Sequence, residues 1–261
     1  MDAARTLGRK GTSQQVNADH DAQLRLLDLQ AVDTSLAQLA HRRRTLPELA
    51  ALAEREQRAA ALADEVIDAE TRAGDLADQQ RRLENEVDAV RARAVRDEQR
   101  MQNGGLPAKE IESLQHEVAT LARRQASLED ELLEVMEQRD EADSAVAQLT
   151  EQRGALDAER AELIATRDSA FAEIDSAVEA RSTERAALAG EAPSDLLALY
   201  ERAREHGGGV GAAMLRQRRC EGCRIELSGS ELTAVRTAAP DEVVRCDNCR
   251  RILIRTDESG L

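Results

Sequence analysis

Apolar side chains recur along most of the chain at alternating steps of three and four positions. From residue 111 onward, one series of these positions is apolar throughout: Leu114, Leu121, Leu128, Val135, Ala142, Leu149, Leu156, Leu163, Ala170 and Ala177. The companion series is interrupted by arginine: Arg139, Arg153, Arg160, Arg167 and Arg181. A mean step of about 3.5 residues predicts a long helix in a coiled coil. Because arginine can lay its methylene groups on a seam and keep its charge in water, the second series favours a two-stranded coil over a bundle.

The first half of the chain carries the same repeat less regularly. The repeat holds from Leu29 to Leu39 and again from Leu62 to Ala94, but its phase changes between the two stretches, just after Pro47. A proline within a helix removes a backbone hydrogen bond and clashes with the preceding turn. We therefore expect a kink or a short break near Pro47.

A run of helix-breaking residues separates the two halves, Asn103-Gly104-Gly105-Leu106-Pro107. Asn and Gly end helices in left-handed conformations, and Pro fits the first turn of the next helix. Two heptad helices joined by a short loop fold back antiparallel. The predicted fold is mostly α: a long antiparallel two-helix coiled-coil hairpin over residues 20–189, with its turn at about 103–108. The alternative, one continuous helix pairing between chains, is disfavoured by the Gly-Gly-x-Pro break.

The remaining segments lack the heptad repeat. Residues 1–19 show no periodicity and predict a disordered leader. Residues 190–206 predict a linker and a short helix that is capped by Ser194 and stopped by the glycines at 207–209. Residues 207–256 contain short β-like runs and predict a small β-rich ribbon, followed by a tail at 257–261. Because glycines flank the short helix, we expect the ribbon to reorient freely.

The composition limits the class of protein. One Phe, one Tyr and no Trp exclude a large aromatic core, and 33% charged residues are typical of long helices. The net charge of -15 disfavours wholesale electrostatic binding to nucleic acid. No apolar run approaches the roughly 20 residues that span a bilayer, and no export signal is recognisable. We therefore expect a cytoplasmic protein that does not bind membranes.

All four cysteines lie in two Cys-x-x-Cys pairs, Cys220/Cys223 and Cys246/Cys249. Two such pairs, roughly 20 residues apart, supply the tetrahedral thiolate shell of a structural zinc ion. We expect one zinc ion per chain, with no open position for a substrate or water. A redox dithiol normally begins a helix in a βαβ context, and paired disulfides belong to exported chains, so both alternatives are disfavoured. The few apolar residues of the segment indicate that it folds only with metal.

Two groups of residues are candidate contacts for a partner. Arginines surround the cysteine pairs and could bind phosphate: Arg218, Arg219, Arg224, Arg245, Arg250 and Arg251. Nearby acids nearly offset these arginines, and no aromatic residue is available for base stacking. The second group is Leu106 with Pro107, an apolar pair at the hairpin turn that could dock a protein.

Several segments together resemble a known family. Residues 109–117 read KEIESLQHE, residues 199–202 read LYER, and the cysteine pairs read CEGC and CDNC. With the hairpin pattern, these segments resemble the bacterial C4-type zinc-ribbon proteins with an N-terminal coiled-coil hairpin, as an actinobacterial or mycobacterial-like member. The resemblance implies a helical stalk, a small separate zinc-binding head and no catalytic residues. Some members are linked to flagellar or secretion assembly and to transcription regulators, and many are described as nucleic-acid-binding.

The sequence favours a non-enzymatic adaptor or scaffold that uses stalk and head for protein–protein interaction. The alternative is a regulator that contacts DNA or RNA through the ribbon arginines, and a third reading is a self-associating coiled-coil protein. The four histidines, at 20, 41, 116 and 206, are scattered and none is paired with a nucleophile, so no catalytic site can be assembled. We expect one or more protein partners of unspecified identity and no small-molecule substrate.

Overall fold

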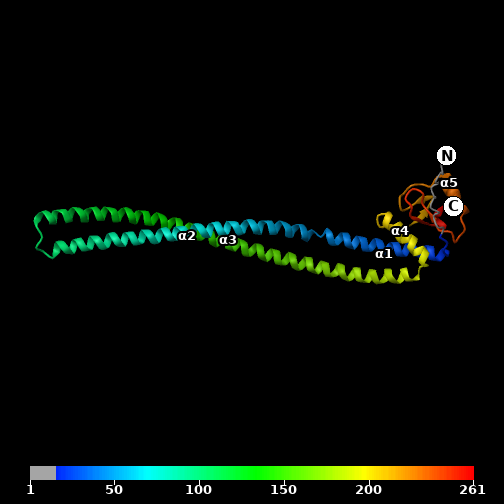
Figure 1. The fold of residues 1–261 in the computed structure, drawn as a ribbon, viewed down its shortest axis with the longest axis horizontal. Helices are drawn as coiled ribbons and strands as arrows, with labels where there is room; N and C mark the ends of the chain where they lie inside the picture. Colours follow the sequence, from blue (N-terminus) through cyan, green and yellow to red (C-terminus); the bar gives the residue numbers. More distant parts are fainter. Residues whose placement is uncertain (1–15) are drawn as a thin grey trace, which may run out of the picture. The chain divides into compact units, whose positions relative to one another are not determined.

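The computed structural model describes residues 16–261, in two compact units. One unit contains residues 47–166, and the other contains residues 16–46 and 167–261 (Figure 1). Residues 1–15 of the expected leader lie outside the described residues. Within residues 16–261, no helix combines the length and the apolar character that a membrane span requires.

Residues 47–166 form an antiparallel helix pair, as the heptad pattern predicted. The pair consists of α2, Pro47–Gln102, and the first part of α3, Ala108–Glu191. Residues 103–107 join the helices, and Gly104 and Gly105 adopt φ values of 73° and 84°. These left-handed conformations suit glycine because it lacks a Cβ. The two helices bury a shared apolar cluster: Leu76, Leu83, Val87, Leu128, Val135 and Ala142.

Three of the arginines in the companion series, Arg139, Arg153 and Arg160, belong to this pair. Arg139 is half-buried, and its Nη1 donates to Gln80 Oε1 across the pair at 3.0 Å. Arg160 is half-buried and Arg153 is exposed. Exposed ion pairs such as Arg91–Glu129, at 3.2 Å, also cross between the helices. Each such pair contributes less than about 1 kcal/mol, so burial of the apolar series supplies most of the stability.

The predicted break near Pro47 is confirmed. Two residues, Thr45 and Leu46, separate the end of helix α1, His20–Arg44, from the start of α2 at Pro47. The Thr45 N–H donates to the carbonyls of His41 and Arg42, at 3.1 and 3.2 Å, and closes the last turn of α1. Proline has no N–H to continue that ladder, but it fits the first position of the next helix.

In the other unit, α1 runs antiparallel to residues 167–191 of α3, and these two segments are here named the hairpin base. Pairs such as Arg185–Asp33 and Arg43–Asp175 connect them. The chain then forms α4, Ser194–His206, and a four-stranded sheet. The remaining elements are β1 (Ala212–Arg216), β2 (Arg219–Cys220), α5 (Gly229–Thr237), β3 (Val244–Arg245), β4 (Ile252–Ile254) and η1 (Asp257–Ser259).

The sheet has the strand order β2-β1-β4-β3. Strands β1 and β4 are parallel, with Ala212 opposite Ile252, and the two outer pairs are antiparallel. Residues 207–261 are named the ribbon here. The predicted tail at 257–261 belongs to it, because Ser259 is 1% exposed and its Oγ donates to the Leu215 carbonyl at 3.0 Å. Short polar segments carry no periodic signal, so this hydrogen bonding could not be predicted.

The ribbon is not separate from the hairpin base, contrary to expectation. One apolar core joins α1, α4, β1 and β4: Ala18, Ala22, Leu26, Leu29, Leu196, Leu199, Tyr200, Ala212, Ile252 and Ile254. Helix α4, expected as part of a linker, therefore lies in the middle of this core, where Leu196 and Tyr200 are 0% exposed. The ribbon consequently cannot reorient freely about its flanking glycines.

Two further expectations at the ends of elements are wrong. Pro193, not Ser194, occupies the N-cap of α4, and no side chain caps that helix. The predicted leader also reached too far, because Ala18 is buried and the Val243 N–H donates to the Val16 carbonyl at 3.1 Å. Residues 16–18 thus satisfy backbone groups of the ribbon that would otherwise lack partners.

Candidate metal centre

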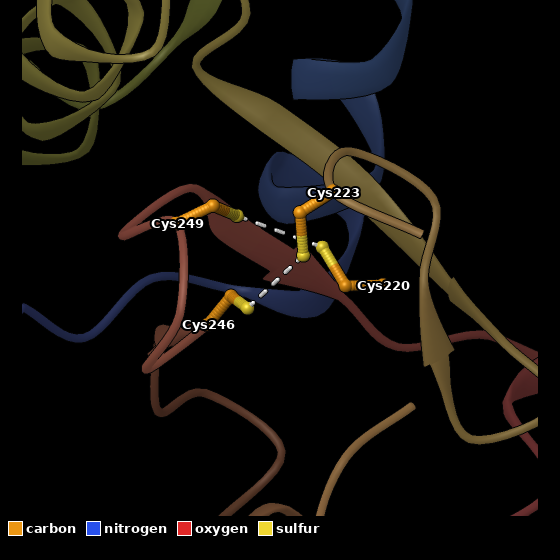
Figure 2. A group of neighbouring side chains, drawn as sticks. All are labelled: Cys220, Cys223, Cys246 and Cys249. Atoms are coloured by element: carbon orange, nitrogen blue, oxygen red, sulfur yellow. Dashed lines mark hydrogen bonds between the residues drawn. The ribbon is translucent and has the colours of Figure 1, made fainter. Parts of the chain in front are cut away.

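The four cysteine side chains converge in the ribbon (Figure 2). All four Sγ atoms lie within 4.8 Å of one another. The Sγ atoms of Cys220 and Cys249 are 3.8 Å apart, and those of Cys223 and Cys246 are also 3.8 Å apart. A tetrahedron with Zn–S bonds of about 2.3 Å has edges of about 3.8 Å. The donor set and its spacing therefore fit a zinc ion bound by four thiolates.

The two cysteine loops have the same backbone geometry. The Arg224 N–H donates to the Cys220 carbonyl at 2.6 Å, and the Arg250 N–H donates to the Cys246 carbonyl at 2.8 Å. Both arginines adopt left-handed conformations, with φ values of 60° and 63°. A non-glycine residue in this region costs about 1–2 kcal/mol. Coordination of one zinc ion by both loops would offset that cost.

Burial and hydrogen bonds shift the pKa values of three thiols. Burial raises the pKa values of Cys220 and Cys246, because desolvation disfavours the thiolate, although backbone N–H groups of each loop oppose the shift. Desolvation acts in the same direction on Cys249, but the Arg251 N–H and neighbouring thiols outweigh it and lower its pKa. A bound zinc ion would stabilise all four thiolates and displace their protons.

The cysteines form part of the second apolar core of the ribbon. Cys220 and Cys246 are buried with Ala213, Leu215, Leu227, Val235 and Leu253. This cluster contains few large side chains, so the bonds to a metal would replace the packing that a larger core supplies. The role of the ion would be structural, since no coordination position remains open.

One of the arginines predicted to contact a partner is occupied within the ribbon. Arg251 is half-buried and donates to the carbonyls of Gly222, Val210 and Gly207, at 2.8, 3.1 and 2.6 Å. It therefore connects the first cysteine loop to the segment that follows α4. With these donors engaged, Arg251 is not available to bind a phosphate.

The other predicted contacts are more exposed. The Nε of Arg218 donates to the Gly260 carbonyl at 3.1 Å. Within residues 16–261, the side chains of four exposed arginines make no hydrogen bond or ion pair: Arg219, Arg224, Arg245 and Arg250. Pro107 is exposed and Leu106 half-buried in the turn of the other unit.

A buried polar cluster was missed by the sequence analysis. Asp33 is 5% exposed and accepts from Tyr200 Oη at 2.7 Å and from Arg185 Nε at 2.6 Å. Gln30 Oε1 accepts from the Gly211 N–H at 2.7 Å and lies 3.2 Å from Tyr200 Oη. The cluster therefore joins the hairpin base, α4 and the ribbon. The lone tyrosine on the apolar face of a short helix was the one available signal.

This cluster also affects ionisation. Burial raises the pKa of Tyr200, and the hydrogen bond to Asp33 adds to the shift. The same carboxylate raises the pKa of Arg185 through its hydrogen bond, which outweighs the opposing effect of burial. Tyr200 and Arg185 therefore both keep their protons throughout the physiological pH range.

Comparison with known proteins agrees with this architecture. The family model of the CT398-like coiled coil hairpin domain matches residues 29–208, and that of the C4-type zinc ribbon domain matches residues 219–253. The uncharacterized protein Rv2229c of Mycobacterium tuberculosis is 44% identical over 232 residues, 89% of this chain and 94% of that protein. The uncharacterized protein ML1638 of Mycobacterium leprae is 35% identical over 214 residues, 82% and 92% of the two chains.

A solved structure from Mycobacterium smegmatis matches this chain with a TM-score of 0.83 and 39% sequence identity. The match covers 92% of this chain and 100% of the solved chain. CT398 from Chlamydia trachomatis has a TM-score of 0.68 at 20% identity, covering 91% and 98% of the two chains, and shows the shared fold. The predicted resemblance to hairpin proteins with a C4-type ribbon is confirmed.

Proposed function

The chain belongs to the CT398-like coiled coil hairpin family, and from that premise we propose that it is a non-enzymatic adaptor. In this proposal the helix pair and the ribbon each present a surface to another protein, and one zinc ion per chain maintains the ribbon. The expected setting is the cytoplasm. The four cysteines would use every coordination position, which supports a structural and not a catalytic role for the ion.

The observation that carries the proposal is the core shared by ribbon and hairpin base. Ten buried residues from α1, α4, β1, β4 and the segment preceding α1 pack in one cluster, and the cluster around Asp33 links the same elements. Such packing produces a rigid platform. A rigid platform suits the presentation of surfaces, because a preorganised surface loses little conformational freedom when a partner binds.

The turn at 103–107 is a second candidate surface. Pro107 is exposed, and Leu106 beside it is half-buried. Gly104 and Gly105 supply the left-handed conformations of the turn. The exposed part of the apolar pair beside them is a surface on which a partner could dock.

A pull-down tests the adaptor proposal directly. We expect the intact, zinc-loaded chain to retain a defined protein partner, and Leu106→Gln to abolish retention without changing helicity or zinc content. Retention through the turn should persist as salt rises, because apolar docking is little affected by screening. Unaltered retention by the Leu106 variant, or its loss only together with helicity, would contradict docking at the turn.

The second candidate function is binding of DNA or RNA by the ribbon. The observation in its favour is the set of exposed arginines without partners among residues 16–261: Arg219, Arg224, Arg245 and Arg250. Binding through phosphates would weaken steeply with salt, with a log–log slope of about -0.7 to -0.9 for each contact. Such a slope for an RNA or DNA oligonucleotide, together with the absence of protein capture, would favour this candidate over the adaptor.

A further inference from the structure

A groove lies between α1 and the glycine loop, defined here as residues 207–210, which connects α4 to the ribbon. Its volume is about 520 Å³, which is within the range of sites that enclose a ligand or several side chains of a peptide. Thr34, Ala37, His41 and Arg42 contribute to the α1 wall, and Gly209 and Val210 contribute to the opposite wall. All of these elements belong to one compact unit.

The groove is open because small residues line both walls. Thr34 and Ala37 are short side chains on the exposed face of α1. Across from them, Gly208 and Gly209 adopt φ values of 65° and 96°, and no atom lies within 4 Å of the point where a Cβ would stand. The groove therefore offers main chain and short side chains at close approach, which suits a peptide backbone.

The glycine loop is held in position from two sides. Arg251 donates to the carbonyls of Gly207 and Val210 at 2.6 and 3.1 Å, and the same guanidinium donates to Gly222 of the first cysteine loop at 2.8 Å. On the other side, Gln30 Nε2 donates to the Gly209 carbonyl at 3.1 Å. The groove is thus preformed, and binding there would not have to order a mobile loop.

The rim of the groove is basic although the chain as a whole is acidic. Helix α1 ends in His41, Arg42, Arg43 and Arg44. Arg43 pairs with Asp175, whereas the side chains of His41, Arg42 and Arg44 have no partner in the described part of the chain. The net charge is -15. Basic residues are also stabilising at the C-terminal end of a helix because of the helix dipole, but the helix dipole does not account for the groove beside them.

None of the described residues that line the groove is acidic. Glu201 and Glu205 line an adjacent depression on the α4 side of Gly209. Glu201 pairs with Arg185 and Arg204, at 2.5 and 2.9 Å. The unpaired positive charges of Arg42 and Arg44 are therefore only partly offset, and they complement a negatively charged ligand.

We propose that this groove binds an acidic segment of a partner protein. An apolar side chain of that segment packs on Ala37 and Val210, while its carboxylates pair with Arg42 and accept a hydrogen bond from His41. This inference rests on the adaptor function proposed above, and it supplies the surface and the chemistry of the partner. It also gives the zinc-binding loop a role at the groove, since Arg251 transmits the position of that loop to the groove wall.

Fluorescence anisotropy with the full-length, zinc-loaded chain tests the proposal. The probe is a fluorescein-labelled helical peptide rich in Glu, Leu and Ala, and the comparison peptide has Gln in place of every Glu. We expect the Glu peptide to bind at least about tenfold more tightly, and Ala37→Glu and Arg42→Glu each to weaken it by about tenfold. Ala37→Glu lies on an exposed helix face, so thermal unfolding of that variant should not change. Arg42→Glu removes a favourable charge from the last turn of α1 and should lower the Tm slightly, so affinity is compared below the unfolding transition of each variant.

Arg96→Glu is the matched control, because it makes the same charge change at an exposed residue of α2 that is not among those lining the groove. It should alter affinity by less than about twofold. Equal binding of the two peptides, or binding unaffected by Ala37→Glu and Arg42→Glu, would overturn the proposal. The proposal would also be overturned if Arg42→Glu weakened the binding of an oligouridine probe but left the binding of the Glu peptide unchanged. If the peptide tests failed in this way but Leu106→Gln still abolished partner capture in the pull-down, the adaptor function would be retained and only the groove proposal would be rejected.

Discussion

At the scale of single residues, Asp33 shows how a buried charge is accommodated. Its carboxylate accepts from Tyr200, Arg185 and Arg204, at distances of 2.7, 2.6 and 3.5 Å for the nearest contacts. A buried carboxylate without such donors would be strongly destabilising. The cluster instead connects three helices, and Gln30 Oε1 also accepts from the N–H groups of Gly211 and Ala212, where β1 begins. We therefore expect its members to be important for stability.

Tyr200→Phe tests the cluster without changing the shape of the core. The variant keeps the ring and deletes the hydroxyl that donates to Asp33 and is within hydrogen-bond distance of Gln30. Leaving these buried groups with fewer donors should lower the free energy of unfolding by about 1–2 kcal/mol. Urea unfolding followed by circular dichroism measures the change.

The matched control for that experiment is Asp168→Ala, which removes an exposed ion pair with Arg167. It should change stability by less than about 0.5 kcal/mol. If Tyr200→Phe were as mild as this control, the polar cluster would not contribute to the attachment of the ribbon.

A second prediction at this scale concerns protons and zinc. Because burial raises the pKa values of Cys220 and Cys246, these thiols hold their protons at neutral pH until a metal displaces them. Below the thiol pKa values, each further pH unit lost should weaken zinc binding by up to about tenfold for every proton displaced. Zinc transfer to a chromogenic chelator between about pH 8 and pH 5 measures this effect. Affinity independent of pH would exclude thiolate ligands.

At the scale of elements, the helices follow directly from local patterns. Heptads and the Asn-Gly-Gly-x-Pro run predict α2, α3 and their turn, because each depends on residues close together in sequence. Strand β1 was not predicted. Its residues, AAMLR, are good helix formers. It becomes a strand because β4 pairs with it and because its residues pack in the apolar cores. Both effects depend on residues that are distant in sequence.

Two glycine-to-alanine substitutions compare a glycine in the turn with a glycine inside a helix. Gly105 has a φ of 84°, which is unfavourable for alanine, so Gly105→Ala should destabilise the helix pair by about 1–2 kcal/mol. Gly154 lies within α3 with no atom within 4 Å of a Cβ position, so Gly154→Ala should stabilise it by up to about 1 kcal/mol. Thermal unfolding compares the two. Equal effects would contradict the left-handed turn.

At the scale of the whole molecule, the cysteines and the hairpin could be predicted, but the attachment of the ribbon could not. Metal-ligand spacing is a local chemical signal, as is the heptad repeat. The shared core is instead built from dispersed small and apolar residues, such as Ala22, Leu196 and Ile252. None of these stands out in its own segment. Glycines around α4 suggested a flexible linker, whereas Gly211 is required because a Cβ there would lie 2.7 Å from the Tyr200 carbonyl oxygen.

The central claim is that zinc maintains the ribbon and that the ribbon and hairpin base stabilise each other. Hydrogen exchange of the full-length chain, measured by mass spectrometry with zinc bound and after chelation, tests this claim most directly. We predict faster exchange after chelation in the ribbon, in α4 and in the N-terminal half of α1, while residues 47–166 keep their protection. Faster exchange confined to the ribbon, or no change anywhere, would contradict the account.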